Sequence, residues 1–250
     1  MDLGIAGKRA LVLGASRGLG AACARALLAE GVEVHGVSRS GTVVDPAMTA
    51  IAADLSQREG VERVIRAVAA LPRIDILVAN TGGPRPGSIR GVGATEWRAS
   101  FEAMAIALFS IADAVLPGMI AAGWGRIVTI GSSSIEQPIP GLAISNTVRS
   151  AIAGWSKTLA SEVAPHGVTV NMVLPGRIDT DRVRELDDAR AQASGAPVAE
   201  VREQIMRDIP AARYGRPEEF GAVVAFVASA HASYATGSML RVDGGLIRSV

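Results

Sequence analysis

Residues Gly14–Gly20 read Gly-Ala-Ser-Arg-Gly-Leu-Gly and decide the fold of this chain. They follow the apolar run Arg9–Leu13 (RALVL), which is typical of a buried strand, and they open the alanine-rich segment Leu19–Glu30, which predicts a helix ended by Gly31. Glycine lets a backbone turn sharply and approach a bound group closely, and a helix N-terminus offers free N–H groups and positive dipole. A glycine pattern alone is a weak signal, but this strand–turn–helix context strongly indicates a pyrophosphate-binding turn.

The rest of the chain repeats this alternation of short apolar runs and helical segments. The predicted strands are Arg9–Leu13, Val32–Val37, Ala50–Ala53, Ile74–Ala79, Arg126–Ile130, Val168–Val173 and Met239–Val242. The predicted helices are Leu19–Glu30, Gln57–Ala70, a long segment capped by Thr95 and running to about Ala122, Gly141–Ala164, a polar stretch over Asp181–Arg207, and Pro217–Ala230. This order predicts an α/β fold with a doubly wound parallel sheet, covered by helices on both faces, in a single domain over residues 1–250.

One crossover is short. Between the strand ending near Ser38 and the strand starting near Thr49, little room remains for a helix and two loops. Gly41 and Pro46 would interrupt a helix there. We therefore expect an irregular loop or a single turn.

Composition narrows the function classes. The formal net charge of +1 gives no indication of a nucleic-acid partner, and 49% hydrophobic residues allow a large core. Cys23 is the only cysteine, which excludes a disulfide within the chain and fits a reducing compartment. The N-terminus lacks the features of a signal peptide, and we expect no stretch of the ~20 apolar residues that span a bilayer. The expectation is a cytoplasmic protein with no membrane contact and no metal site, because no His, Cys and carboxylate cluster has ligand spacing.

The glycine spacing G-x-x-x-G-x-G, together with further motifs along nearly the whole chain, resembles the short-chain dehydrogenase/reductase family. The matching segments are Asp54-Leu55, Asn80-Thr81-Gly82-Gly83, Ile130–Ser133, Pro175-Gly176, Gly215–Glu219 and Val242–Gly245. The turn at Asn80 departs from the family's Asn-Asn-Ala-Gly at its second and third positions. The resemblance implies a Rossmann-type fold and a nicotinamide cofactor. It implies cofactor contacts from Gly14, Ser16, Arg17, Gly18, Leu19, Gly20, Arg39, Asp54, Leu55, Asn80, Gly82, Arg149, Pro175 and Gly176.

Charge at the end of the second strand distinguishes the two nicotinamide cofactors. An acidic residue there would bind the 2′-hydroxyl of NAD and repel the 2′-phosphate of NADP. The segment Val37–Ser40 contains no acid, and Arg39 and Arg17 could both face a 2′-phosphate. The sequence therefore favours NADP (NADPH) over NAD.

The catalytic positions of the family carry other residues here. In the family a Tyr transfers the substrate proton, a Lys one helical turn later lowers the pKa of that Tyr and holds the nicotinamide ribose, and a Ser orients the carbonyl. With Lys157–Ala160 and Val168–Asn171 as anchors, the Tyr position falls on Ser145 and the Lys position on Arg149. Ser132 stays at the position of the Ser.

The register of this alignment does not change the conclusion. The upstream Asn that supports the family's proton relay corresponds to Met104. The two tyrosines, Tyr214 and Tyr234, lie in C-terminal segments, and no Lys follows either of them one turn later. No register therefore restores a Tyr–Lys pair.

Ser132, Ser145 and Arg149 remain as catalytic candidates. A serine is a far weaker acid than a phenol, and Arg149 stays charged, so neither replaces the proton relay, although all three could stabilise a developing alkoxide. Two hypotheses stay open. The first is an NADP-dependent oxidoreductase of atypical mechanism that acts on a small carbonyl or alcohol substrate, as in 3-oxoacyl-acyl-carrier-protein reductase-like members with this Ser/Arg variant. The second is a catalytically inactive NADP-binding sensor, scaffold or partner subunit. The resemblance also implies a homotetramer or homodimer, built through the helices that carry Met104 and Ser145 and through the last strand.

Overall fold

In the computed structural model of this chain, which describes residues 1–249, parallel strands form one seven-stranded sheet in the order β3-β2-β1-β4-β5-β6-β7. The strands are β1 (Arg9–Leu13), β2 (Glu33–Ser38), β3 (Thr49–Ala52), β4 (Ile76–Ala79), β5 (Gly125–Ile130), β6 (Val168–Pro175) and β7 (Met239–Val242). The α-helices are α1 (Gly18–Ala29), α2 (Arg58–Ala69), α3 (Ala94–Phe101), α4 (Ala107–Ala121), α5 (Ala143–Val163), α6 (Asp181–Ser194), α7 (Val198–Asp208) and α8 (Pro217–Val227). The predicted doubly wound α/β fold is confirmed.

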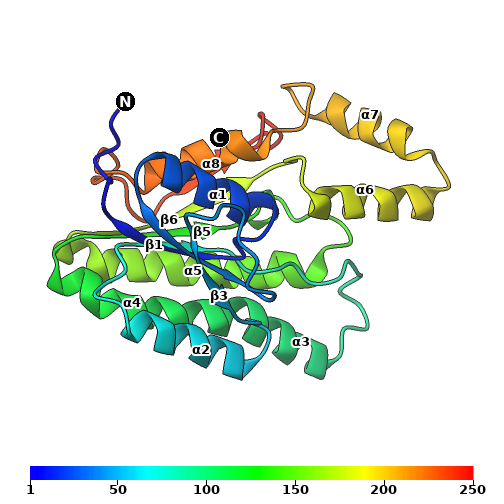
Figure 1. The fold of residues 1–250 in the computed structure, drawn as a ribbon. Coiled ribbons are helices and arrows are strands. Elements are labelled where there is room, and N and C mark those ends of the chain that lie inside the picture. The colour runs from blue at the N-terminus through cyan, green and yellow to red at the C-terminus, as the bar shows by residue number, and fades with distance from the viewer. Residues whose placement is uncertain (250) are drawn as a thin grey trace.

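The sheet separates two hydrophobic cores. Along β1, Leu11 faces the core under α2, α4 and α5, whereas Val12 faces the core under α1 and α8. Figure 1 shows these two helical layers, with α1 and α8 on one side of the strands and α2, α4 and α5 on the other. Because both faces are covered, the central strands are apolar on both sides, and all four residues of β4 are buried.

Most predicted elements are confirmed within two or three residues, including the irregular β2–β3 crossover, which contains no helix. Two expectations are wrong. Gly93, and not Thr95, is the N-cap of α3. The polar stretch predicted as one helix is two helices, α6 and α7, because Gly195 adopts a left-handed φ of 70° and Pro197 follows it. The α6–α7 hairpin projects from the body in Figure 1 and has a small hydrophobic core of its own.

The run Ala94–Ala121 also differs from expectation. It forms 28 residues of continuous helix, and an 18-residue window within it has a mean hydropathy of 1.9, which by length and composition would suffice to cross a membrane. The expectation that no segment reaches that length is therefore wrong. The residues that make this helix apolar, such as Leu108, Ile111 and Met119, are fully buried core residues. Its middle part, η1 (Glu102–Ile106), is a turn of π-helix that carries Met104.

Candidate functional site

The glycine turn lies at the carboxyl edge of the sheet, between β1 and β4. The chain leaves β1 towards α1 and leaves β4 towards α4, on opposite faces, which makes this the switch point where open α/β sheets bind ligands. A Cβ atom on Gly14 would lie 2.6 Å from Nδ2 of Asn80, and a Cβ on Gly20 would collide with the Gly14 carbonyl oxygen. Side chains at these two glycines are excluded, so the turn can stay tight against the loop after β4.

The N-terminus of α1 is open to an anion. Arg17 is its N-cap residue, no side chain caps the helix, and its first turn has no acidic residue. Its free N–H groups and positive dipole therefore lack a partner within residues 1–249. A dinucleotide pyrophosphate fits this cradle because it offers the negative charge and the acceptors that the helix end lacks.

The residues expected to contact the adenosine lie beyond β2 and β3. Ser38 is buried and donates to the carbonyl oxygen of Thr42 at 2.9 Å, which shapes the start of the irregular crossover. Arg39 is exposed. Asp54 accepts hydrogen bonds from the backbone N–H and the hydroxyl of Ser56, which, with a smaller contribution from the charge of Arg39, lower the pKa of Asp54. Leu55 packs against the hydrophobic core, so its side chain anchors the loop between β3 and α2.

Ser132 lies two residues after the end of β5, the strand next to β4. Its Oγ accepts a hydrogen bond from the backbone N–H of Ser134 at 3.1 Å and caps the short helix η2 (Ser133–Ile135). Because the hydroxyl oxygen is fixed as an acceptor, its own O–H remains available to donate.

Ser145 and Arg149 lie one helical turn apart on α5 and touch each other. Nε of Arg149 donates to Oγ of Ser145 at 3.3 Å, and its Nη1 donates to the carbonyl oxygen of Ile130 at 3.0 Å. The guanidinium group therefore bridges α5 and the end of β5, beside Ser132. Burial, followed by the positive charge of Arg182, lowers the pKa of Arg149 to about 10. Arg149 thus keeps its charge near neutral pH.

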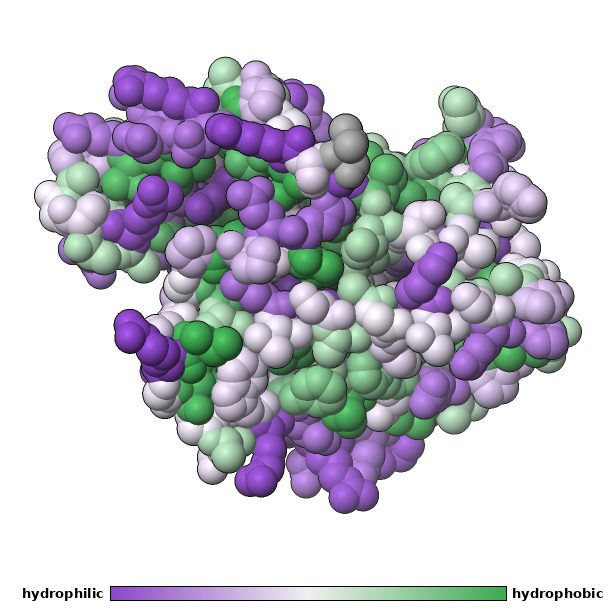
Figure 2. All heavy atoms as spheres, turned by 180° about the vertical axis from the view of Figure 1, so that it is seen from behind, coloured by the Kyte–Doolittle hydropathy of each residue, from purple (hydrophilic) through white to green (hydrophobic). Residues whose placement is uncertain are grey.

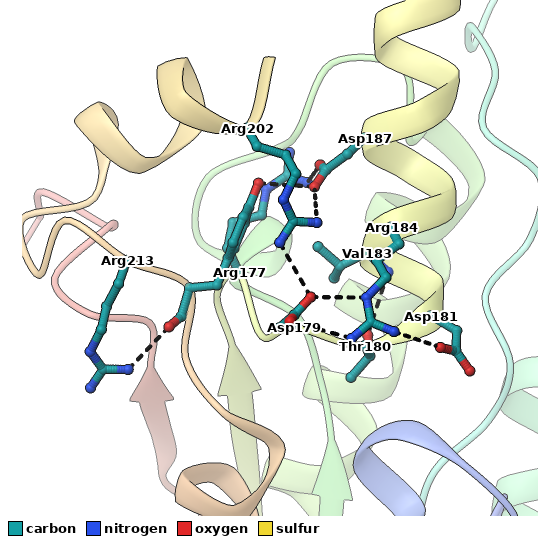
Figure 3. A network of polar contacts seen from close by, with 10 residues as sticks. Arg177, Asp179, Thr180, Asp181, Val183, Arg184, Asp187, Arg202 and Arg213 are labelled. Carbon is teal, nitrogen blue, oxygen red and sulfur yellow. Dashed lines mark hydrogen bonds and ion pairs between the residues drawn. The ribbon is translucent and has the colours of Figure 1, made fainter. Parts of the chain in front are cut away.

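The α6–α7 hairpin covers the site and is anchored by ion pairs (Figure 3). Asp187 is 1% exposed and binds Arg177 at 3.0 Å, Arg202 at 3.5 Å and the hydroxyl of Tyr214 at 2.9 Å. Burial, and then the hydrogen bond to Asp187, raise the pKa of Tyr214 to about 12. Asp179 extends the network, since hydrogen bonds from Arg184 and Arg202 lower its pKa. The network joins both helices of the hairpin to the loop after β6.

The expected site residues fall into two groups. The glycine turn, Asn80, Ser132 and the Ser145–Arg149 pair meet at the carboxyl edge, on neighbouring strands or packed against them. Pro175 ends β6 at the same edge, but Gly176 faces the C-terminal segment, where its Cβ would lie 2.6 Å from Cα of Asp243. Gly82 has open space around it, so no close contact explains a glycine there.

The sequence analysis missed three residues at the site. Thr180 caps α6, and its Cβ lies 3.8 Å from the position of a Cβ on Gly18, so it closes the hairpin onto the glycine turn. Arg182 reaches the loop after β4, and Asp187 anchors the hairpin. The only available signal was a threonine before an acidic residue at the start of a polar helix, which predicts a cap but no contact across the chain.

Comparison with known proteins gives a consistent assignment. A family model described as "Enoyl-(Acyl carrier protein) reductase" matches residues 14–247. The chain is 34% identical over 252 residues to the 3-oxoacyl-(acyl-carrier-protein) reductase FabG of Vibrio cholerae, covering 98% of this chain and 99% of that protein. It is 36% identical over 249 residues to FabG of Escherichia coli, covering 96% and 97%. Among solved structures, L-sorbose reductase from Gluconobacter frateurii, complexed with NADPH and L-sorbose, superposes with a TM-score of 0.90 at 30% identity over 100% of both chains.

Proposed function

Because the chain belongs to the short-chain dehydrogenase/reductase family, we propose that it is an NADP-dependent oxidoreductase that keeps the family's Ser as Ser132 and has Ser145 and Arg149 in place of the usual Tyr and Lys. Its substrate is a small carbonyl compound or the matching alcohol, its place is the cytoplasm, and residues 1–250 act as one cofactor-binding unit. The observation that carries this proposal is the contact between Arg149 and Ser145 at the end of β5, next to Ser132.

The glycine turn and the open N-terminus of α1 would hold the pyrophosphate, and Asn80 supports that turn from the loop after β4. Arg39 and Arg17 would face the 2′-phosphate. No acidic residue that would repel this phosphate occurs between the end of β2 at Ser38 and Asp45. When bound, NADPH supplies the hydride. L-sorbose reductase, a structural neighbour, was solved with NADPH, which supports this choice of cofactor.

The chain's own residues would bind and polarise the carbonyl. The O–H groups of Ser132 and Ser145 are free to donate to the substrate oxygen, because each serine oxygen already accepts a hydrogen bond. Arg149 stabilises the negative charge that develops on that oxygen, and its bond to Ser145 strengthens the serine O–H as a donor. The final proton would come from water, since neither a serine nor a charged arginine is an efficient acid near neutral pH.

Two measurements on the same preparation test the proposal. NADPH and NADH are titrated by cofactor fluorescence, and NADPH oxidation is followed over a panel of ketones and aldehydes. We expect tighter binding of NADPH than of NADH, together with turnover of at least one carbonyl class. Equal or tighter binding of NADH contradicts the NADP assignment, and binding without turnover across the panel supports the alternative of an NADP-binding protein without redox activity.

A further inference from the structure

Arginines gather around the mouth of the proposed active site. Arg85 and Arg90 lie in the loop after β4, Arg149 lies on α5 and Arg182 lies in the first turn of α6. Within residues 1–249, no carboxylate lies within ion-pair distance of Arg85, Arg90 or Arg149. Elsewhere most arginines of this chain pair with Asp or Glu, as the hairpin network shows (Figure 3). Three arginines without an ion-pair partner in the described residues therefore lie in the segments around this mouth.

Arg182 is held across the cleft. Its Nη2 donates to the carbonyl oxygen of Pro84 at 2.7 Å, and its guanidinium group lies over Gly83, with Nη2 at 3.5 Å from the position of a Cβ there. A Cβ at Gly83 would make ordinary van der Waals contact with this group. Its one carboxylate partner, Glu185, is 3.4 Å away and exposed, and such surface pairs are weak enough for an incoming anion to compete with them.

The hairpin network fixes the helix that carries Arg182. Thr180 caps α6, and Arg184 binds Asp179 and Asp181 on either side of that cap. Figure 2 shows the hairpin as a largely hydrophilic lobe that stands off the body, with a recess beneath it. The first turn of α6 is therefore anchored at the edge of this recess, and Arg182 is positioned before any ligand arrives.

Arg149 is anchored at the end of the next strand and lies close enough to Arg182 for their charges to interact. It is bound to the end of β5, whereas Arg182 is bound to the loop after the neighbouring strand β4. Its Nη2 has no hydrogen-bond partner within residues 1–249. The repulsion between the two cations contributes to the lowered pKa of Arg149. An anion between them would relieve that repulsion.

The phosphates of the cofactor do not explain this pair of cations. The pyrophosphate cradle follows β1, and β4 lies between β1 and β5 in the sheet. Since neighbouring strands are about 4.8 Å apart, the end of β5 lies roughly 10 Å from the glycine turn. Arg85, Arg90 and Ile144 line a hollow of about 170 Å³ beside the loop after β4, and the carboxylate residue Glu96 lines it as well. The anchor of Arg149 at the end of β5 thus lies away from the pyrophosphate cradle.

We propose that the carbonyl substrate also carries an anionic group, either a carboxylate or a phosphate, and that this group binds between Arg149 and Arg182. The N–H groups that these bonds leave unused, among them those of Nη2 of Arg149, can donate to the oxygens of either group. This inference rests on the proposed function, because it assigns the substrate class of the same site.

Binding to the dead-end complex with NADP⁺ tests the inference without requiring turnover, since the oxidised cofactor cannot reduce a carbonyl. Calorimetry compares two matched pairs of probes: acetoacetate with methyl acetoacetate, and dihydroxyacetone phosphate with dihydroxyacetone. We expect at least one anion to bind about tenfold or more tightly than its neutral partner. The pair that shows the preference distinguishes a carboxylate from a phosphate substrate.

Variants on one helix identify the residue responsible. Arg182→Gln should lower the preference for the anion about tenfold, and Arg182→Lys should keep part of it. Arg190→Gln removes the same charge from an exposed position further along α6 and should leave the preference unchanged. Melting temperatures and NADPH affinities of the variants show whether each one is folded.

Equal affinity within both pairs, or no binding of either anion at millimolar concentration, overturns the inference. An equal effect of Arg182→Gln and Arg190→Gln also overturns it, because general electrostatics would then explain the preference. The proposed function fails by a different result, the absence of NADPH binding or of NADPH oxidation.

Discussion

Arg149 differs from a lysine at the same position in its ability to exchange a proton and in the geometry of its hydrogen bonds. A lysine can change its protonation state when buried, whereas a guanidinium group keeps its proton and binds in a fixed plane. Here that plane already bonds to the end of β5 and to Ser145. The pair is built to hold charge and orientation rather than to relay protons.

Restoring the family's pair tests this interpretation of the site. In the double variant Ser145→Tyr, Arg149→Lys, the phenol ring needs space at a serine that is only 9% exposed. Met104, which is 3% exposed, lies in the π-turn that packs against α5, so the neighbourhood is already filled with apolar atoms. We expect native activity to fall about tenfold or more, with no gain on simple ketones. The measurement is NADPH oxidation over a ketone panel with cofactor affinity as control, and a large gain in the variant would contradict a rebuilt site.

Selectivity for the cofactor should depend on Arg39. If its guanidinium group faces the 2′-phosphate, Arg39→Ala should weaken NADPH binding by about 10- to 100-fold and change NADH binding little. Arg98→Ala on α3 removes an arginine far from β2 in the sequence and serves as the control. Fluorescence titration of both cofactors measures these affinities. A parallel loss of NADPH and NADH affinity would contradict the assignment of Arg39 to the 2′-phosphate.

At the scale of elements, the α6–α7 hairpin depends on few core contacts and many ion pairs. Its own core is small, and its attachment to the body passes through the buried carboxylate of Asp187. A charged group that is 1% exposed is costly unless it is paired, and here two arginines and a tyrosine hydroxyl surround it. The stability of the hairpin is therefore concentrated in one residue.

Removing that charge should loosen the hairpin selectively. Breaking a fully buried ion pair costs about 3–5 kcal/mol, but Arg177 and Arg202 keep some contact with water, so we expect about 1–3 kcal/mol for Asp187→Asn. Glu203→Gln breaks an exposed pair with Arg207 on the same hairpin and should cost less than about 1 kcal/mol. Thermal unfolding and limited proteolysis near Gly195 compare the two variants, and equal behaviour would refute the role of Asp187.

Alkaline pH should weaken the same anchor through Tyr214. Its pKa is raised to about 12 in the folded protein, above the value of about 10 for an unfolded chain. The folded state therefore keeps its proton longer, so this contribution to stability is complete below pH about 10 and is lost as the pH rises towards 12. Phenolate absorbance in the variant Tyr234→Phe reports Tyr214 alone; ionisation near pH about 10 would show that the buried hydrogen bond to Asp187 is not formed.

Periodicity and turn chemistry predict elements well, because they act over a few neighbouring residues. The β2–β3 crossover followed from Gly41 and Pro46, and β7 was predicted at its observed bounds. The split between α6 and α7 was visible in Gly195 and Pro197 but was outweighed by the polar composition around them. Contacts such as the one between Arg182 and Pro84 span the sequence, so no local pattern could predict them.

At the scale of the whole molecule, the outer surfaces suggest how copies of the chain assemble. Figure 2 shows apolar residues on the surface, and Phe226, Tyr234, Met239 and Leu240 are large apolar side chains exposed near the C-terminus. On the opposite face, Phe109 of α4 stacks on Trp155 of α5 with ring centroids 4.6 Å apart, and both rings are only partly covered. These are the two regions expected to form a homotetramer or homodimer.

A single exposed glycine can test the helical contact. A Cβ on Gly154 of α5 meets nothing within 4 Å, so Gly154→Arg should not disturb the isolated subunit but should block close approach of a second α5. We expect light scattering to show an oligomer for the unmodified protein and half that mass or less for the variant. Ala69→Arg at an exposed position of α2 is the control. A monomer at micromolar concentration before any change, or no difference between the variants, contradicts this assembly.

The missing helix between β2 and β3 also has a consequence for motion. β3 is an edge strand of four residues, three of them exposed, and it pairs on one side only. Segments with so few contacts open locally far more often than a sheet centre, and their amide hydrogens exchange early with solvent. The residues expected to contact the adenosine therefore lie beside an edge of the sheet that is held by few contacts. Bound NADPH would slow deuterium uptake at Thr49–Ala52, and the rate of cofactor release would follow the opening of this edge rather than the movement of the hairpin.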